Sequence, residues 1–246
     1  AALKTKATIT NEGYNLNGSK SFISGGGFSD LYVVLCRTGD QTPNGISMVL
    51  VEDGQNGLSF GKKEQKMGWK AQPTAIVQFD NCSIPATNLV GEEGAGFKYA
   101  MEGLDGGRLN IAAASLGGAQ KSYEIAKAYS KERSAFGKPI SRFQSIEFKL
   151  ADMATQLESA RLFLRNAAWK LDNSKPDASV SVAMAKRLVT DVSFEVSNTA
   201  LQILGGYGYL EEYGIEKIVR DLRVHQILEG TNEIMRVIIA RAILSE

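Results

Sequence analysis

Near its end the chain carries Glu229-Gly230-Thr231, a carboxylate followed by a glycine and a hydroxyl residue, between two apolar helical patterns. A connection between helices can turn backbone N–H groups toward a ligand, while neighbouring Ile and Leu side chains keep water away. A carboxylate held there is a candidate general base. The alternative is a solvated residue at a helix end, which is the more frequent environment of a Glu before a Gly.

His225 lies one helical turn before Glu229 and is the only histidine of the chain. We do not assign it a direct role, because a single His in a helix more often caps the helix or packs in the core. The only cysteines, Cys36 and Cys82, lack metal-ligand spacing. The sequence therefore predicts neither a zinc site nor a disulfide framework, and it suits a reducing compartment.

The composition agrees with a soluble enzyme domain that can bury a sizeable core, since 43% of the residues are hydrophobic and 22% are charged. The net charge is +1, from 28 basic and 27 acidic residues spread along the chain. This balance gives no electrostatic footprint for nucleic acid or for a membrane surface, and no apolar run has membrane length. The expected partners are small molecules and other subunits.

The N-terminal part reads as strands and turns. Asn17-Gly18 and Asn44-Gly45 are hairpin-type dipeptides, and apolar or β-branched runs occupy Leu31–Cys36, Ile46–Val51 and Ala75–Phe79. Glycines between residues 91 and 96 interrupt the chain, and helical periodicity follows. We place a domain boundary near residue 91.

The C-terminal part reads as helices near 95–132, 178–204, 214–227 and 231–244, with one more along a clear apolar seam. Ser141 and Gln144 have the spacing of a capping box at the start of that helix. Short connections favour a four-helix-type bundle. The seam residues follow a 4-3-4-3-4-3-4 spacing: Ile146, Leu150, Met153, Leu157, Ala160, Leu164, Ala167 and Leu171.

Two glycine-rich segments, Gly25–Gly27 and Gly205–Gly208, do not have the strand-turn-helix context of a dinucleotide-binding fingerprint. A turn and a helix cap explain them without a ligand. A third pair, Gly106-Gly107, interrupts a helical pattern, where each glycine costs about 1 kcal/mol relative to Ala. A close helix contact, with a salt bridge between Asp105 and Arg108, would account for this pair.

Four ordered stretches together resemble the acyl-CoA dehydrogenase family, and the resemblance covers nearly the whole chain. They are Phe22–Gly25, Arg133–Ile140 with Phe143 and Gln144, Gln202–Tyr209 and Arg223–Arg236. The implied fold is α+β and multi-domain, with a small β-barrel-like middle domain at 1–91, incomplete at its start, and an antiparallel four-helix-type bundle at 92–246. In the family an all-helical domain and a Gly-Ser-rich loop come first, so we expect this chain to be a fragment that lacks them.

The resemblance implies α,β-dehydrogenation of an acyl-CoA thioester, with Glu229 as the base for the α-proton and FAD as the hydride acceptor. Most relatives carry Trp where Phe22 stands and Asn where Gly25 stands. If the resemblance is set aside, we would interpret Phe22 as a core residue of a strand, Arg133 as a solvated cation and Gln144 as a helix-capping residue. The implied flavin contacts, several of them to the cofactor of a neighbouring subunit, are Phe22, Ile23, Ser24, Arg133, Phe143, Gln144, Gln202, Ile203, Leu204, Gly205, Gly206, Thr231, Asn232 and Glu233.

The implied acyl-CoA contacts are Asp105, Gly106, Gly107, Arg108 and Arg241. Within the family, Leu150–Thr155, Arg165–Ala168 and Arg223–Asn232 are most similar to the branch that acts on isobutyryl-CoA, and short-chain and 2-methyl-branched acyl-CoA are the next candidates. The implied partners are an electron-transfer flavoprotein and identical subunits, as a homotetramer. The implied location is the mitochondrial matrix in a eukaryote or the cytoplasm in a bacterium. A same-fold acyl-CoA oxidase and a non-catalytic assembly or interaction module remain the alternatives.

Overall fold

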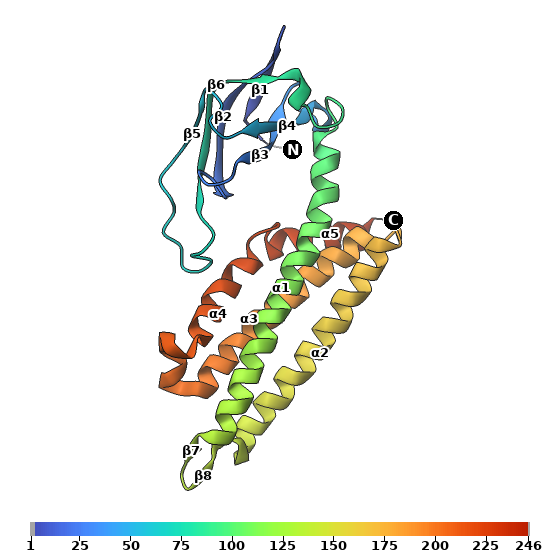
Figure 1. Ribbon diagram of the computed structural model, residues 1–246. Coiled ribbons are helices and arrows are strands. Elements are labelled where there is room, and N and C mark those ends of the chain that lie inside the picture. The colour runs from blue at the N-terminus through green and yellow to red at the C-terminus, as the bar shows by residue number, and fades with distance from the viewer. Residues whose placement is uncertain (1–2, 246) are drawn as a thin grey trace. The chain divides into compact units, whose positions relative to one another are not determined.

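The computed structural model describes residues 3–245 of the chain. The chain divides into two compact units, Ala1–Gly103 and Leu104–Glu246 (Figure 1). The first contains the strands of one sheet and the second consists mainly of helices, so the protein is of mixed α and β structure. The division falls inside the first long helix, whereas the sequence predicts a boundary near residue 91, in the glycine-rich connection before that helix.

Six strands form the sheet of the first unit: β1 (Lys6–Thr10), β2 (Gly13–Ser24), β3 (Leu31–Arg37), β4 (Ile46–Glu52), β5 (Leu58–Phe60) and β6 (Thr74–Pro85). Their spatial order is β4-β3-β1-β2-β6-β5. Within residues 3–245, β1 and β3 are the neighbouring strands that pair in parallel, and the other neighbours are antiparallel. The three strands predicted from apolar runs are confirmed as β3, β4 and β6.

The barrel-like closure expected for this unit is not found in the described residues. Strands β4 and β5 stand at the two edges of the sheet, and no ladder joins them. Closure requires both edge strands to pair, and β5 offers only three residues. The β4 edge instead meets the chain beyond β6 through an isolated bridge between Val49 and Leu89. The sheet is therefore open.

The prediction of a hairpin turn at Asn17-Gly18 is wrong, because both residues lie inside β2. Gly18 coincides with a register shift between β2 and β6 and has a φ of +134°. A Cβ at Gly18 would lie 2.9 Å from the Cα of Thr5, so the glycine allows a close backbone approach. Asn44-Gly45 does lie in the connection between β3 and β4, within the short 3-10 helix Pro43–Gly45.

Alternate side chains of the strands form the core of this unit, including Leu16, Val49, Val51 and both cysteines. Cys36 and Cys82 are buried free thiols. Burial raises the pKa of the Cys36 thiol to about 11, so the thiol stays protonated at neutral pH.

In the part of the chain that the structure describes, the second unit is built from five α-helices, the first of which begins in the first unit. They are α1 (Gly96–Glu132), α2 (Gln144–Asp172), α3 (Ala178–Leu204), α4 (Ile215–Arg223) and α5 (Asn232–Leu244). The three long helices share one apolar core (Figure 1). The shorter α4 and α5 pack against α3. The predicted helix at 214–227 ends earlier than expected, since Val224–Gln226 form a 3-10 turn.

The apolar seam predicted for α2 is confirmed, because Met153, Leu157, Ala160, Leu164 and Ala167 are buried in the helical core. The predicted capping box is wrong. Ser141 lies in the 3-10 helix Ile140–Arg142, and the residue that caps α2, Phe143, makes no side-chain cap. The backbone of Phe143 accepts the first amide bond of α2 from Ile146 N at 2.8 Å, so the helix begins without Ser141.

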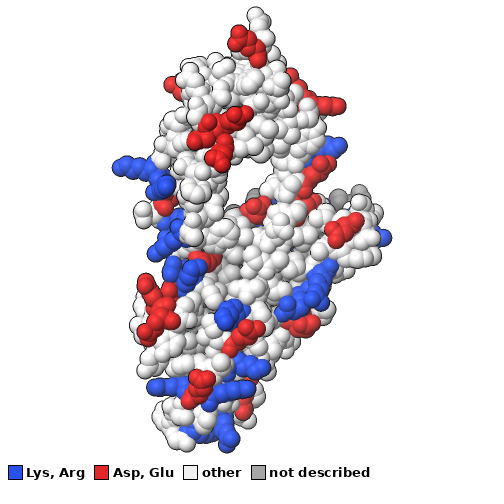
Figure 2. Space-filling model, in the orientation of Figure 1, with Lys and Arg blue, Asp and Glu red and all other residues white. Residues whose placement is uncertain are grey.

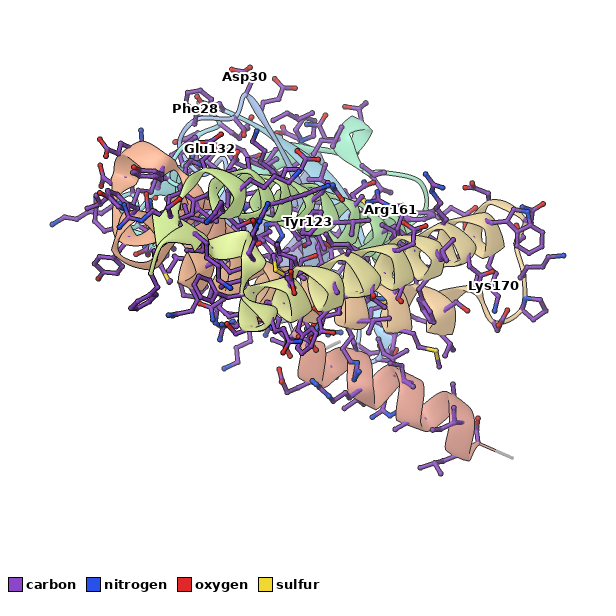
Figure 3. The ribbon with its side chains drawn as sticks, turned by 90° about the horizontal axis from the view of Figure 1, so that it is seen from below. Phe28, Asp30, Tyr123, Glu132, Arg161 and Lys170 are labelled. Carbon is purple, nitrogen blue, oxygen red and sulfur yellow. The ribbon has the colours of Figure 1, made fainter. Side chains whose placement is uncertain are left out.

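Polar contacts join the outer faces of the long helices. Arg161 on α2 donates to Gln120 Oε1 on α1 at 2.9 Å, and Lys170 pairs with Asp177 across the α2–α3 connection. Figure 3 labels the side chains of Arg161 and Lys170. Basic and acidic side chains are interspersed on the face seen in Figure 2. No helix within residues 3–245 is both long and apolar enough to cross a membrane.

Candidate active site

The loop that carries Glu229 connects the 3-10 turn Val224–Gln226 to α5, as predicted. Glu229 and Gly230 both have left-handed backbones, with φ of +56° and +88°. The loop ends at Thr231, whose side chain caps α5 by accepting a hydrogen bond from Ile234 N at 3.3 Å. A glutamate with positive φ is strained by about 1–2 kcal/mol, and such strain persists where surrounding contacts enforce it.

The carboxylate of Glu229 lies directly against the backbone of α1 at Gly107. A Cβ at Gly107 would stand only 2.6 Å from Glu229 Oε2, closer than a real Cβ contact allows. Helix α1 continues without a break through Gly106 and Gly107. The contact at Gly107 is therefore with the side chain of a loop residue, the predicted base, and not the helix–helix contact considered for these glycines. Among the described residues, nothing beyond the adjoining backbone lies within 4 Å of the Cβ position at Gly106.

Asp105 and Arg108 form the ion pair that the sequence offers as one explanation of this segment. Arg108 Nη1 lies 2.9 Å from Asp105 Oδ1, and both residues are buried. Arg108 also donates from Nε to the carbonyl oxygen of Glu229 at 3.2 Å, and Ser179 on α3 donates to Asp105. The ion pair thus fixes one end of the base loop to α1.

Sequence reasoning missed the contacts that fix the other end of this loop to α3. Lys186 is fully buried and donates from Nζ to Gly230 O and to Asn232 Oδ1, each at 2.8 Å. Asn232 donates in turn to Asp191 Oδ1 at 2.7 Å and to Thr190 Oγ1 at 3.0 Å. A signal was present: Lys186 falls on the apolar face of its helix, in phase with Val182 and Val189.

His225 is buried between the end of α4 and α1. Its Nδ1 lies 2.6 Å from Ser115 Oγ on α1. Burial lowers the pKa of His225 to about 4, so the imidazole is neutral at physiological pH.

The buried histidine should make the stability depend on pH. Because the folded pKa of about 4 lies below the usual value of 6.5, the unfolded chain binds the proton more readily, and stability falls as the pH drops from 6.5 to 4. The loss should reach roughly 2–3 kcal/mol. Denaturant unfolding of His225→Gln, which does not titrate there, should show a smaller loss over this range. Equal losses in the two proteins would contradict the assignment.

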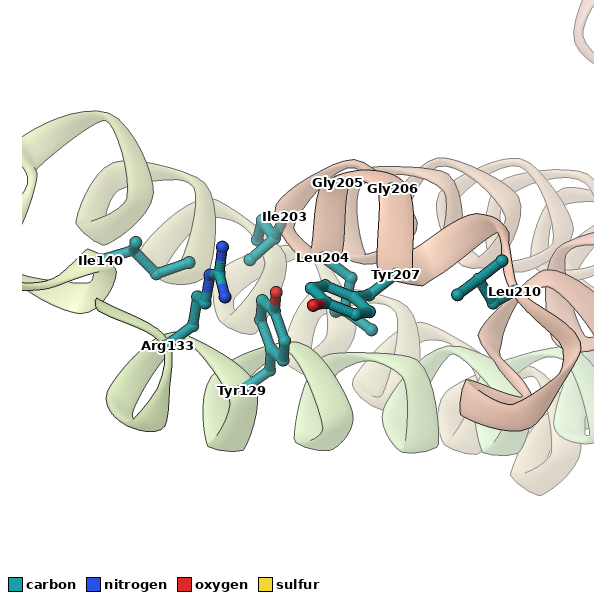
Figure 4. A pocket seen from close by; sticks show the side chains of 9 residues that line it. All are labelled: Tyr129, Arg133, Ile140, Ile203, Leu204, Gly205, Gly206, Tyr207 and Leu210. Atoms are coloured by element: carbon teal, nitrogen blue, oxygen red, sulfur yellow. The ribbon is translucent and has the colours of Figure 1, made fainter. Parts of the chain in front are cut away.

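A second candidate site is a pocket of about 380 Å³ between the end of α1 and the end of α3 (Figure 4). Arg133, Gly205 and Gly206 line it, and the Arg133 guanidinium lies 5.5 Å from the centre of the Tyr207 ring. Gly205 caps α3 with a φ of +60°, which confirms the predicted glycine cap. The residues that line the pocket are Tyr129, Arg133, Ile140, Ile203, Leu204, Gly205, Gly206, Tyr207 and Leu210.

The structure brings together only part of the predicted flavin set in this pocket. Ile203 and Leu204 join Arg133 and the two glycines, whereas Phe143, Gln144 and Gln202 are not among the lining residues. Gln144 and Gln202 are exposed at the first turn of α2 and the last turn of α3. The centre of the Phe143 ring lies 4.3 Å from Nζ of Lys138, a residue of the small hairpin formed by β7 (Ser134–Ala135) and β8 (Lys138–Pro139).

The remaining predicted residues lie in other places. In the first unit Phe22 is exposed at the end of β2 with a φ of +58°, beside the half-buried Ile23 and the exposed Ser24. On α5 the side chains of Glu233 and Arg241 are exposed. Glu233 pairs with Arg236 at 3.4 Å.

Residues 94–244 match the family described as "Acyl-CoA dehydrogenase, C-terminal domain", and residues 1–82 match its middle domain. Isobutyryl-CoA dehydrogenase, mitochondrial, of Bos taurus is 53% identical over 100% of this chain and 59% of its own length. The chain thus spans about three fifths of that curated relative.

Two solved structures show the same fold at high similarity. Butyryl-CoA dehydrogenase from Megasphaera elsdenii has a TM-score of 0.94 at 46% identity, over 98% of this chain and 63% of its own. A structure described as the electron transferring flavoprotein of Acidaminococcus fermentans has a TM-score of 0.96 at 46% identity, over 100% of this chain and 64% of its own. The two family models together match most of the chain, and the fold agrees with both solved structures: the chain belongs to the acyl-CoA dehydrogenase family.

Proposed function

We propose that the protein is an FAD-dependent dehydrogenase of short or branched acyl-CoA thioesters, with Glu229 as the base that removes the α-proton. The observation that carries this proposal is the strained loop that turns the Glu229 carboxylate onto Gly107. A helix-end glutamate in solvent would need neither a left-handed backbone nor a glycine beneath it. The arrangement is typical of a carboxylate held for chemistry.

The residues around Glu229 supply its orientation. Gly107 leaves room for the carboxylate beside α1, and Arg108 holds the Glu229 carbonyl. A proton on the carbon next to a thioester carbonyl is only weakly acidic, so a carboxylate must be desolvated and aligned to remove it. The N–H of Glu229 is the proposed donor to the thioester oxygen, where negative charge develops as the proton leaves.

FAD, when bound, supplies the acceptor for the β-hydrogen. The pocket at the end of α3 suits the ADP half of such a group, because no atoms occupy the space that a Cβ at Gly205 or Gly206 would take. Backbone can therefore approach a ligand closely there. The planar, permanently charged guanidinium group of Arg133 can donate hydrogen bonds to two phosphate oxygens. In this proposal Ile203, Leu204, Gln202, Phe143 and Gln144 complete that contact.

The other proposed cofactor contacts come from separate segments. Phe22, Ile23 and Ser24 would meet the flavin ring, and the proposal extends to Thr231, Asn232 and Glu233. Asn232 is the least able of these residues to turn its side chain toward a cofactor, since that side chain is hydrogen-bonded to Lys186, Thr190 and Asp191.

For the substrate we favour isobutyryl-CoA, because the Bos taurus relative bears that name and covers the whole chain. Asp105, Gly106, Gly107, Arg108 and Arg241 are the proposed acyl-CoA contacts. Of these, Arg241 is the most open to a charged ligand, since it is exposed on the last turn of α5.

We further propose an electron-transfer flavoprotein as the electron acceptor, supported by the description of the Acidaminococcus fermentans structure. Contacts to a neighbouring subunit's FAD would require a homo-oligomer, and a tetramer is the proposed form. The mitochondrial name of the Bos taurus relative supports the mitochondrial matrix if the source is eukaryotic, and the bacterial cytoplasm is the corresponding proposal otherwise.

Anaerobic mixing of the complete holoenzyme with isobutyryl-CoA tests the proposed activity. The flavin absorbance should bleach and stay bleached until an external acceptor is added, and it should bleach faster than with butyryl-CoA or 2-methylbutyryl-CoA. Pivaloyl-CoA, which has no α-hydrogen, is the matched control and should leave the flavin oxidised. Peroxide formation in air would indicate an oxidase, and no spectral change with any acyl-CoA would indicate a binding or assembly module.

A further inference from the structure

We propose that Lys186 is a positioning residue for the base: it holds the Glu229 loop in its strained conformation by binding Gly230 and Asn232 on either side of Thr231. The inference rests on the proposed function, in which Glu229 removes the α-proton. Lys186 Nζ lies 2.8 Å from the carbonyl oxygen of Gly230 and 2.8 Å from Asn232 Oδ1.

Lys186 occupies a buried position on α3, where a lysine is unusual. Among the described residues, Lys186 has the largest side chain that is fully buried. Lys is almost never fully buried unless it is paired, because removing an ammonium from water costs several kcal/mol. Its helix neighbours in phase, Val182 and Val189, are apolar and equally buried. An apolar residue would serve packing alone, so the ammonium must do something that an apolar residue cannot.

The charges around Lys186 show what retains the ammonium there. Burial lowers the pKa of Lys186 to about 8, against the opposing attraction of Asp191, Glu229 and Glu233, while Arg108 adds to the lowering. The carboxylates include the base itself. Lys186 therefore keeps most of its charge at pH 7 and draws the loop toward α3.

The backbone of the loop needs such an anchor. Glu229 and Gly230 are consecutive residues with positive φ, a conformation that a free chain rarely adopts at a glutamate. Two buried cations from different helices bind their successive carbonyl groups: Arg108 on α1 binds Glu229 O at 3.2 Å, and Lys186 on α3 binds Gly230 O. With its backbone bound on both sides, the turn places the carboxylate of Glu229 against Gly107.

The variant Lys186→Met in the complete holoenzyme tests this role, because Met fills a similar volume and donates no hydrogen bond. We expect the rate constant for flavin reduction by saturating isobutyryl-CoA to fall about 10- to 100-fold. The dissociation constant of the substrate should change less than about threefold and the FAD content should stay unchanged. Val189→Ala is the matched control, since it also disturbs the buried face of α3, where Val189 lies in the apolar core, and removes no hydrogen bond to the loop. Its reduction rate should stay within about twofold of the wild type.

Hydrogen exchange of the amides between residues 228 and 232 provides a readout that does not depend on the reaction. Exchange should speed up at least about tenfold in Lys186→Met relative to Val189→Ala. If Lys186→Met does not fold, Lys186→Gln, which is neutral and too short to reach both acceptors, is measured with the same expectations.

The outcomes separate the two proposals. Unchanged exchange and an unchanged reduction rate in the Lys186 variant would overturn the positioning role, as would an equal loss of rate in Val189→Ala. A wild-type holoenzyme that no acyl-CoA reduces would overturn the proposed function, while faster exchange in Lys186→Met would still support the anchor.

Discussion

Replacing Glu229 with Gln should slow flavin reduction by acyl-CoA about 10²- to 10⁴-fold, the usual effect of removing a general base. Gln keeps the shape of the side chain and can still fit against Gly107, but it cannot accept the α-proton. The Arg108 and Lys186 contacts involve backbone carbonyls of the loop, so they survive the substitution. Stopped-flow absorbance of the complete holoenzyme would measure the loss, and FAD content and substrate affinity should stay close to wild type.

The matched control is Glu195→Gln, which neutralises an exposed glutamate of α3. Its reduction rate should not change, so a loss confined to Glu229→Gln would follow from the base and not from the change in net charge. Near-normal bleaching in Glu229→Gln would place the base elsewhere. Glu233→Gln would then be the next variant to test.

Replacing Arg108 with Met should reduce the free energy of unfolding by about 3–5 kcal/mol, because it leaves the carboxylate of Asp105 buried without its ion pair. Arg108 and Asp105 are 8% and 9% exposed, so water cannot readily replace the lost partner. Denaturant unfolding, followed by the helical signal, would measure the effect. The acyl-CoA affinity should fall more than the FAD affinity if Arg108 also binds the substrate.

A double variant separates the ion pair from other effects of Arg108. Asp105→Leu together with Arg108→Met removes both charges, so it should be more stable than Arg108→Met alone. A loss below about 1 kcal/mol in the single variant would show that the pair is solvated in solution, contrary to its burial.

The helices and strands with strong local periodicity could be predicted from the sequence. The α2 seam repeats over the whole helix, and the apolar runs of β3, β4 and β6 are continuous, so each element is specified by residues within itself. Signals of two to four residues were less reliable. Asn17-Gly18 became part of β2 because pairing with β6 along a long strand outweighs the preference of one dipeptide.

The open edge of the sheet could not be predicted from the sequence either. Whether β4 pairs with β5 or meets Leu89 depends on how distant segments pack, and no local pattern records that choice. The missing cap at Ser141 has a similar cause, since the preceding residues formed a 3-10 helix whose end already supplies the first acceptor of α2.

The sequence by itself determined that a Glu-Gly-Thr connection stands between two helices and that Gly107 needs a special contact, because these facts depend on residue types at neighbouring positions. Only the tertiary structure decided that the two belong together. The contact joins α1 to the loop before α5, and Lys186 reaches that loop from α3. Such long-range contacts follow from helix packing, which brings distant residues within hydrogen-bond reach and makes a buried lysine favourable only beside acceptors from another helix.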